Sequence, residues 1–142
     1  MKVKDIMSKD VASLNSDDSI EKAAQLMKQY DVGSIPVCNQ QKIVGMVTDR
    51  DITLRSTAQG KNTKQQKVSD IMSSNPIIGT PEMDIHEAAK IMSKEQIRRL
   101  PIVDNNNLVG IVALGDISVE PNLQDNAEKA LNNISQSNSS HM

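Results

Sequence analysis

The sequence predicts an α/β (α+β) fold made of two copies of one β-α-β-β-α unit, and three observations carry this prediction. The chain has 142 residues, and residues 3–8 (VKDIMS) return as residues 68–73 (VSDIMS). Within each copy, apolar residues recur at the spacing of an amphipathic helix. Each helix is followed by two short apolar runs that flank a polar loop, which is the pattern of a β-hairpin.

The internal repeat organises the chain. Met7 and Met72 are 65 residues apart. At this offset the two copies stay in register without a gap as far as Asp51 and Asp116. A match of that length indicates two copies of one supersecondary unit.

The first helix of each copy is predicted by apolar residues at positions i, i+3, i+4 and i+7. Asp18 lies three residues before Glu21, and Asp84 three residues before Glu87, so both helices resemble a capping box at their start. The apolar positions are Ile20, Ala23, Ala24 and Met27 in the first copy and Ile85, Ala88, Ala89 and Met92 in the second.

The hairpins follow these helices. In the first copy the apolar runs 35–38 and 43–47 flank a polar loop, residues 39–42, and in the second copy 100–103 and 108–112 flank residues 104–107. We expect a further helix after each hairpin. The first would run from Asp49 to Gln59 and stop at Gly60, a residue typical of helix C-termini. The second follows Pro121 and has the apolar stripe Leu123, Ala127, Ala130, Leu131 and Ile134.

These patterns divide the chain into a first repeat over residues 1–60, a polar linker over 61–67 and a second repeat over 68–134. The tail 135–142 is rich in Ser and Asn and is predicted to be disordered. One repeat is too small to bury its helices alone. We therefore expect the repeats to pack sheet to sheet, with pseudo-two-fold symmetry and a shared core.

Composition excludes several classes of protein. The formal net charge is −2 and aromatic residues make up 1% of the chain, with Tyr30 alone, so neither a basic surface nor base stacking supports nucleic-acid binding. No apolar run reaches the roughly 20 residues of a membrane span, and no h-region follows Met1. The single cysteine, Cys38, cannot form an internal disulfide. We therefore expect a cytoplasmic protein with no membrane association.

No catalytic motif is present. The sequence contains no P-loop and no nucleophile triad pattern, so we expect no enzyme activity. His86 and His141 have no second His or Cys at ligand spacing, so no metal site is expected either.

With these motifs the chain resembles a tandem cystathionine-β-synthase (CBS) domain pair, also called a Bateman module. The resemblance rests on the paired opening motifs, the paired Ala-Ala-x-x-Met helices and the paired motifs IPV at 35–37 and LPI at 100–102. It also rests on the terminal signatures of the two copies, GMVTDRDI at 45–52 and GIVALGDI at 110–117. It covers residues 1 to about 134. It implies two clefts between the repeats, an adenine-nucleotide ligand such as AMP, ADP or ATP, and a homodimer.

The resemblance also assigns polar ligand contacts. The family signature Gly-x-x-Thr/Ser-x-x-Asp places a phosphate-binding hydroxyl at Thr48 and a ribose-binding carboxylate at Asp51. The family's phosphate arginine tends to precede the hairpin proline of the opposite repeat, where this chain has Arg98 and Arg99. We predict that these four residues form one competent cleft.

The opposite cleft is predicted to be weak or empty. It keeps the carboxylate Asp116, but Ala113 replaces the threonine and Gly33 and Ser34 stand where the arginines would be. A charge-assisted contact to phosphate contributes about 1.5–3 kcal/mol, so its loss weakens binding by about tenfold or more. Alternatively, Asp116 and Asp51 stabilise helix N-termini, and Arg98 and Arg99 lie at a solvated helix end.

Base-lining residues are carried over by position from the family. They are Val11, Ala12, Ile35, Pro36 and Val37 in the first copy and Ile77, Ile78, Leu100, Pro101 and Ile102 in the second. Their assignment to one cleft or the other is left open. Arg50 and Arg55 are interpreted as surface salt-bridge residues, and the alternative is that they assist phosphate binding.

The sequence thus predicts a regulatory protein that senses adenine nucleotides and changes its repeat or dimer arrangement on binding. Its target would be a separately encoded enzyme or transporter. The alternative is a dimeric scaffold that binds protein without any nucleotide. The residues leave the preferred adenosyl ligand, the regulated partner and the dimer orientation open.

Overall fold

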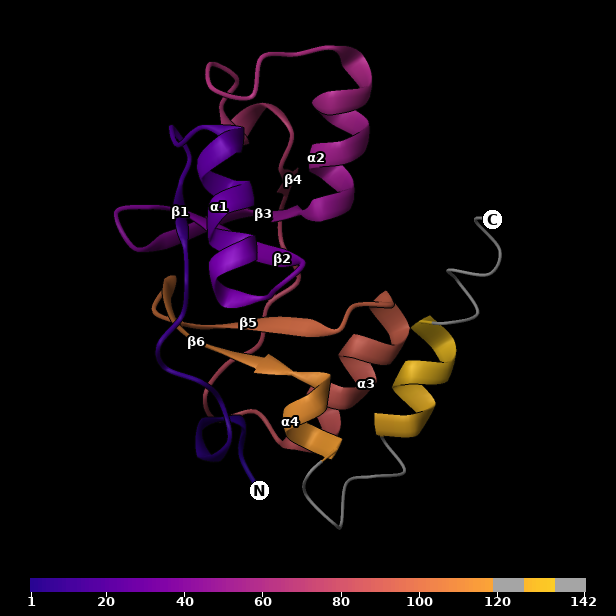
Figure 1. Ribbon diagram of the computed structural model, residues 1–142. Coiled ribbons are helices and arrows are strands. Elements are labelled where there is room, and N and C mark those ends of the chain that lie inside the picture. The colour runs from indigo at the N-terminus through magenta and orange to yellow at the C-terminus, as the bar shows by residue number, and fades with distance from the viewer. Residues whose placement is uncertain (119–126, 135–142) are drawn as a thin grey trace. The chain divides into compact units, whose positions relative to one another are not determined.

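The computed structural model describes residues 1–118 and 127–134. The chain forms two compact units, and their composition differs from a simple division into repeats (Figure 1). Unit 2 comprises Ala12–Pro76 with Asn106–Leu108, and unit 1 comprises Met1–Val11, Ile77–Asn105 and the described residues from Val109 onward. Each unit therefore combines the helix of one repeat with the opening residues of the other.

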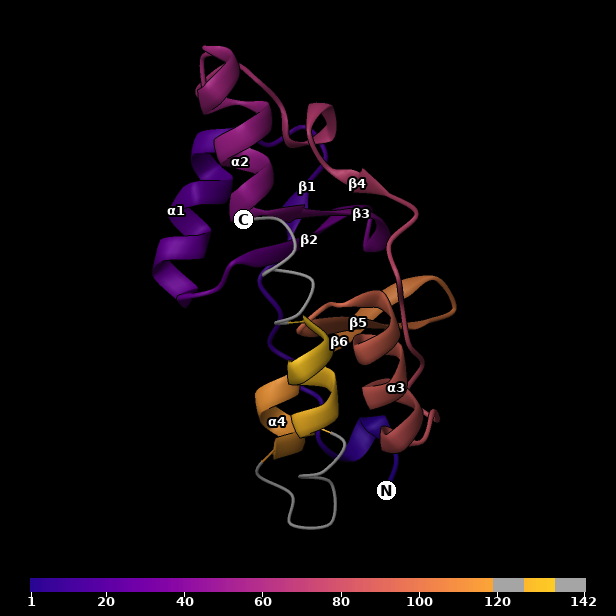
Figure 2. The ribbon, with the colours of Figure 1, turned by 90° about the vertical axis from the view of Figure 1, so that its right-hand side faces the viewer.

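The strands of unit 2 are β1 (Leu14–Asn15), β2 (Ser34–Asn39), β3 (Lys42–Thr48) and β4 (Ser73–Ser74). In this unit, β1 pairs with β2, β2 with β3, and β3 with β4. β1 runs parallel to β2, whereas β3 is antiparallel to both β2 and β4. Helices α1 (Ile20–Tyr30) and α2 (Asp49–Arg55) lie side by side against one face of these strands (Figures 1 and 2).

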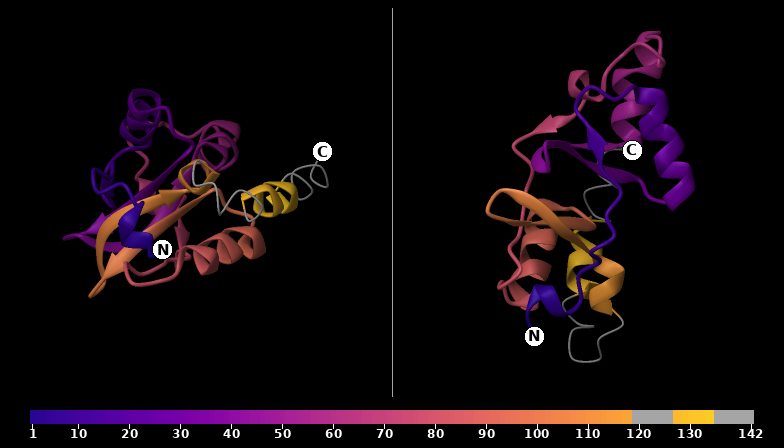
Figure 3. Two further views of the ribbon diagram at one scale, coloured as in Figure 1. Left: turned by 90° about the horizontal axis from the view of Figure 1, so that it is seen from below. Right: turned by 90° about the vertical axis from the view of Figure 1, so that its left-hand side faces the viewer.

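Unit 1 repeats this arrangement with β5 (Arg99–Asp104) and with β6 (Asn107–Ala113) from Val109 onward. Gly79 bridges to Ile102 in parallel and Ser8 bridges to Ile111 antiparallel, at the positions that β1 and β4 occupy in unit 2. Helices α3 (Ile85–Glu95) and α4 (Leu114–Ser118) and the helix over 127–134 cover one face of the hairpin (Figures 2 and 3). The predicted α+β fold of paired repeats is confirmed.

The amphipathic helices form where the apolar spacing places them, but one cap differs from the prediction. The N-cap of α1 is Ser19, whose Oγ accepts from the Lys22 N–H at 3.1 Å. Asp18 instead accepts from the Asn15 N–H at 2.8 Å and lies 3.3 Å from the Lys22 ammonium, so the predicted box with Glu21 is wrong. Asp84 does cap α3, and its carboxylate accepts from the His86 N–H.

The helix after the first hairpin is shorter than expected. α2 ends at Arg55, because Ser56 leaves helical geometry with φ −121° and ψ −72°. A separate 3-10 turn covers Thr57–Gln59 and ends at Gly60, whose φ of +69° favours glycine. In the second copy the sequence prediction missed α4, although α4 begins at the position that the repeat offset makes equivalent to the start of α2. Leu123 and the tail 135–142 lie outside the described residues.

Both hairpins turn through two residues with positive φ rather than through the four-residue loops expected. These residues are Gln40 and Gln41 in the hairpin of β2 and β3, and Asn105 and Asn106 in the hairpin of β5 and β6. Two consecutive residues with positive φ match the twist of a tight hairpin, and Asn tolerates this conformation better than most side chains do. The strands therefore extend further toward the turn than the apolar runs alone predicted.

Opening segments dock at matching places in the two units. In unit 1, the Val3 N–H donates to the Met83 carbonyl at 2.8 Å, and in unit 2 the Val68 N–H donates to the Asp18 carbonyl at 2.9 Å. Met7 packs against Gly110, and Met72 packs against Gly45. At Gly45 an added Cβ would lie 2.8 Å from the Ser73 carbonyl oxygen, so only glycine allows this close approach.

Each unit has its own apolar core. The core of unit 2 is built around Leu14, Ile20, Val47 and Ile71. The core of unit 1 includes Val3, Ile85, Met92 and Ile117, and the described part of the helix over 127–134 adds Ala127, Ala130 and Ile134. Because Val3 and Ile71 are both fully buried, the exchanged opening segments contribute directly to the cores. In the described part of the chain, no helix is long and apolar enough to cross a membrane.

Candidate ligand site

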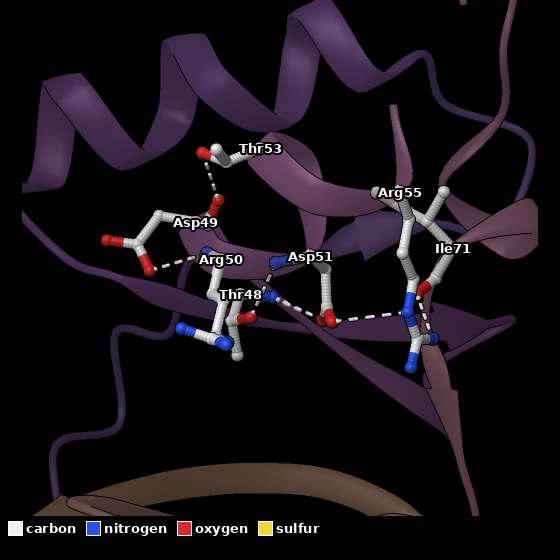
Figure 4. A network of polar contacts seen from close by, with 7 residues as sticks. All are labelled: Thr48, Asp49, Arg50, Asp51, Thr53, Arg55 and Ile71. Atoms are coloured by element: carbon white, nitrogen blue, oxygen red, sulfur yellow. Dashed lines mark hydrogen bonds and ion pairs between the residues drawn. The ribbon is translucent and has the colours of Figure 1, made fainter. Parts of the chain in front are cut away.

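The junction between β3 and α2 fixes Thr48 and Asp51 through two reciprocal hydrogen bonds (Figure 4). The Asp51 N–H donates to Thr48 Oγ1 at 3.0 Å, and the Thr48 N–H donates to Asp51 Oδ2 at 3.0 Å. This capping box holds both side chains at the first turn of α2. Each keeps capacity for a ligand, because the Thr48 hydroxyl hydrogen and the second carboxylate oxygen take no part in the box.

Arg55 faces the second carboxylate oxygen of Asp51. Its Nε lies 3.9 Å from Asp51 Oδ1, and its Nη1 donates to the Ile71 carbonyl at 3.1 Å. The Asp51 side chain is 14% exposed, whereas that of Arg55 is 53% exposed. The Asp51 carboxylate is thus mostly enclosed, and a small part of its surface remains exposed.

Gly33 and Ser34 lie at the start of β2, beside the same helix start. The Asp49 N–H donates to the Gly33 carbonyl at 2.9 Å, and the Asp49 carboxylate lies near the Gly33 Cα, where a Cβ would approach it to 3.2 Å. Unit 2 therefore brings Thr48, Asp51, Gly33 and Ser34 to one end of its hairpin.

Unit 1 contains the matching junction with a reduced set of contacts. The Ala113 N–H donates to Asp116 Oδ2 at 2.9 Å, but Ala113 has no hydroxyl to return the bond. The Leu114 N–H donates to the Arg98 carbonyl at 2.8 Å. Arg98 and Arg99 thus lie in the same unit as Asp116, and their predicted pairing with Thr48 and Asp51 stays a prediction.

Four of the ten predicted base-lining side chains belong to the apolar cores of their own units. Ile35, Val37, Leu100 and Ile102 are at most 1% exposed. Their side chains fill the cores, which leaves little surface for a base. Pro36 and Pro101 are buried as well, whereas Val11 and Ala12 are partly buried and Ile77 and Ile78 are 38% and 40% exposed.

Comparison with known proteins decides the family. The family model described as "CBS domain" matches residues 3–56 and again residues 68–120, which together make up more than half of the chain. The chain belongs to the CBS domain family. The two matched ranges correspond to the two copies that the internal repeat predicts.

Relatives of this CBS-domain chain match it over nearly their whole length. The CBS domain-containing protein YhcV of Bacillus subtilis (strain 168) is 52% identical over 136 residues, which cover 96% of both chains. The crystal structure of Hypoxic Response Protein I, described with two coordinated zinc ions, has a TM-score of 0.78 and 29% identity and covers 84% of this chain and 98% of that one.

A third similar structure was solved with bound ligands. The CBS domain pair of protein MJ0100 was solved in complex with 5′-methylthioadenosine and S-adenosyl-L-methionine. It has a TM-score of 0.73 and 32% sequence identity, and it covers 83% of this chain and 93% of that one.

The described residues of this CBS-domain chain offer neither a reactive thiol nor a metal-binding cluster. Cys38 is buried in β2, and burial raises the pKa of its thiol, which lowers its reactivity. Among the described residues, no group of three or more His, Cys, Asp or Glu side chains could hold a metal ion.

Sequence reasoning placed Thr48 and Asp51 together at the first turn of a helix, where the structure has them, and interpreted Arg55 mainly as a surface salt-bridge residue. The spacing of four residues between Asp51 and Arg55 was a sufficient signal for their pairing on a helix. The contact between Arg55 and Ile71 joins two segments that are far apart in the sequence, and no local pattern could have indicated it.

Proposed function

We propose that this CBS-domain chain is a regulatory module that binds an adenosyl ligand at the Thr48–Asp51 junction. The observation that carries the proposal is the reciprocal capping box, which holds a hydroxyl and a carboxylate in place with donor and acceptor capacity left over. The adenosyl compounds in the MJ0100 complex, a CBS pair 32% identical to this chain, support the choice of ligand class.

Asp51 would bind the ribose of the ligand, and Thr48 would bind its phosphate. The free oxygen of Asp51 accepts from the ribose 2′- and 3′-hydroxyls, which an ionised carboxylate can take together. The Thr48 hydroxyl donates to a phosphate oxygen of AMP, ADP or ATP. A ligand without phosphate, such as 5′-methylthioadenosine, uses the carboxylate alone.

We further propose that the Asp116 junction is the weaker site. Ala113 provides no hydroxyl for phosphate, and Asp116 receives only one of the two box hydrogen bonds. Because the two aspartates occupy equivalent positions on their helices, each serves as the matched control for the other.

Calorimetry on Asp51→Ala and Asp116→Ala tests this asymmetry with AMP, ADP, ATP, 5′-methylthioadenosine and S-adenosylmethionine. Both variants lose one backbone cap, so their folding should suffer comparably. We expect Asp51→Ala to abolish detectable binding and Asp116→Ala to keep most of it. A greater loss in Asp116→Ala would overturn the site assignment.

The role of Arg98 and Arg99 can be separated in the Asp116→Ala background, where only the Asp51 site remains. If these arginines contact the phosphate at Asp51, as the sequence predicts, Arg98→Ala with Arg99→Ala lowers AMP affinity further in that background. If they serve the Asp116 site of their own unit, AMP affinity in that background stays the same.

Binding would regulate by shifting the population of two arrangements of the repeats or of a homodimer. The ligand can shift this equilibrium only by the difference between its affinities for the two states. The effector is a separately encoded enzyme or transporter.

A thermal-shift panel distinguishes this proposal from a nucleotide-independent scaffold. A ligand at 100 times its dissociation constant stabilises a folded protein by about 2.7 kcal/mol, or very roughly 5–10 °C for a chain of this size. If no adenosyl compound shifts the melting temperature, the scaffold function is favoured instead.

A further inference from the structure

Arg55 is the one charged side chain in Figure 4 that connects the Asp51 carboxylate to a distant segment of unit 2. Its Nε lies 3.9 Å from Asp51 Oδ1 while its Nη1 donates to the Ile71 carbonyl at 3.1 Å. One guanidinium group therefore faces the proposed ribose-binding oxygen and holds the main chain of the second repeat's opening segment.

The segment that Arg55 reaches is firmly built into unit 2. Ile71 is buried in the core at 1% exposure, and the Met72 side chain lies against Gly45. Ser73 and Ser74 form β4, which pairs with β3 at Met46 and Gly45. β3 ends at Thr48, so this segment and the capping box belong to one connected group of contacts.

The contact between Arg55 and Asp51 leaves hydrogen-bonding capacity on the carboxylate. A hydrogen bond between a cationic nitrogen and a carboxylate oxygen usually measures about 2.7–2.9 Å. At 3.9 Å the guanidinium attracts Asp51 Oδ1 without occupying its acceptor positions. Ribose hydroxyls that bind this oxygen would therefore join Arg55 in a single network.

We propose that Arg55 is a positioning residue, which orients the Asp51 carboxylate for the ribose diol and couples occupancy of that site to the segment around Ile71. This inference rests on the proposed adenosyl-binding function. Because the chain enters unit 1 after Pro76, the segment that Arg55 holds directly precedes that crossing.

The coupling through Arg55 is expected in one repeat only. At the repeat offset, position 120 corresponds to Arg55, and the sequence has Glu120 there, which lies outside the described residues. A glutamate carries the opposite charge and cannot donate to a main-chain carbonyl in the way arginine does. The coupling is therefore expected for Asp51 and not for Asp116.

Arg50 offers a matched control on the same helix. It is exposed, and its guanidinium makes no hydrogen bond or ion pair within the part of the chain that the structure describes. Arg50→Gln removes the same charge from α2 as Arg55→Gln. Any long-range electrostatic effect on an anionic ligand will appear in both variants.

The test compares 5′-methylthioadenosine, which has the ribose diol but no phosphate, with AMP. We expect Arg55→Gln to weaken binding of both ligands by a similar factor of about three to ten, and Arg55→Lys to weaken both by less. Arg50→Gln should change neither affinity by more than about twofold. A tenfold loss corresponds to about 1.4 kcal/mol. If Arg55→Gln weakens AMP alone, Arg55 contacts phosphate and the positioning role is overturned.

Hydrogen exchange provides a second readout, which a merely structural role would not change. In the wild-type protein, 5′-methylthioadenosine should slow amide exchange within residues 70–74, and in Arg55→Gln at matched saturation this slowing should disappear. Equal protection in both proteins would overturn the coupling. Circular dichroism checks the fold, and Arg55→Met, which also removes the charge and the donors, provides the same comparison if Arg55→Gln does not fold.

The outcomes separate the inference from the function on which it rests. Absence of binding to any adenosyl compound by the wild-type protein overturns the proposed function. Binding that is lost in Asp51→Ala but unchanged in Arg55→Gln preserves the function and overturns the role of Arg55.

Discussion

The difference between Thr48 and Ala113 allows the capping box to be removed from one helix and added to the other. Thr48→Ala deletes the hydroxyl that accepts from the Asp51 N–H at 3.0 Å. Ala113→Thr supplies the missing hydroxyl beside Asp116, whose carboxylate already accepts from the Ala113 N–H at 2.9 Å. The substitutions thus act on one interaction in opposite directions.

The expected magnitudes follow from the contacts. Replacing an N-cap threonine by alanine costs about 0.5–2 kcal/mol, so Thr48→Ala should lower the free energy of unfolding by about 1 kcal/mol. Ala113→Thr should raise it by about 0.5–1 kcal/mol, because α4 begins with its Asp116 half of the box already formed. A hydrogen bond to a charged group contributes about 1.5–3 kcal/mol, so Thr48→Ala should also weaken AMP binding by about tenfold or more.

Urea denaturation measures the stability changes, and calorimetry measures affinity for AMP and 5′-methylthioadenosine. Thr48→Ser is the control, because serine keeps the hydroxyl and should preserve both quantities. The affinity for 5′-methylthioadenosine should change little in Thr48→Ala. If that affinity falls as far as the affinity for AMP, Thr48 does not act on the phosphate. If Thr48→Ala leaves stability unchanged, the capping argument fails.

Two further predictions concern stability. Gly45→Ala should destabilise the protein by about 1–3 kcal/mol, because its Cβ would lie 2.8 Å from the Ser73 carbonyl oxygen. The Cβ of Gly115→Ala meets nothing within 4 Å, so this substitution should stabilise α4 by about 0.5–1 kcal/mol. Urea denaturation midpoints check both substitutions, and equal effects would refute the packing argument. Hydrogen bonds from Lys2 and Lys4 lower the pKa of Glu82 from its ordinary value of 4.5 to about 2. The stability it contributes is therefore present above pH 4.5 and lost as the pH falls toward 2. Between pH 6 and pH 2.5, the free energy of unfolding should fall more steeply in the wild type than in Glu82→Gln. Salt should reduce this difference, because the Lys2–Glu82 pair is exposed. Parallel curves of stability against pH for the two proteins would contradict the prediction.

The fold was predictable wherever the signal was periodic. The stripe from Ile20 to Met27 and its copy from Ile85 to Met92 correspond to α1 and α3. Local geometry was harder to predict, because alternatives separated by one residue have similar sequence signals. Ser19 rather than Asp18 caps α1, and Ser56 interrupts the helix that the pattern extended to Gln59.

The site was predictable to the extent that its contacts are local. Thr48 and Asp51 are three residues apart, so their shared helix turn follows from the sequence. Burial of Ile35 and Leu100 was not readable from their positions, because a strand residue next to a ligand and one in the core have the same apolar character. The contact of Arg55 with Ile71 needs the tertiary structure.

The opening segment of each repeat packs in the unit that contains the helix of the other repeat, so the two units depend on each other for their cores. Val3 belongs to the first repeat but completes the core of unit 1, whereas the helix of that repeat, α1, lies in unit 2. Val68 belongs to the second repeat but completes the core of unit 2, whereas the helix of that repeat, α3, lies in unit 1. A fragment that ends before the second repeat would lack Val68 and Ile71, both almost fully buried. Neither repeat can therefore form its unit alone, and the covalent chain must cross between the units after Val11 and again after Pro76. A ligand that changes the packing of either opening segment therefore acts on chain that leads directly into the other unit.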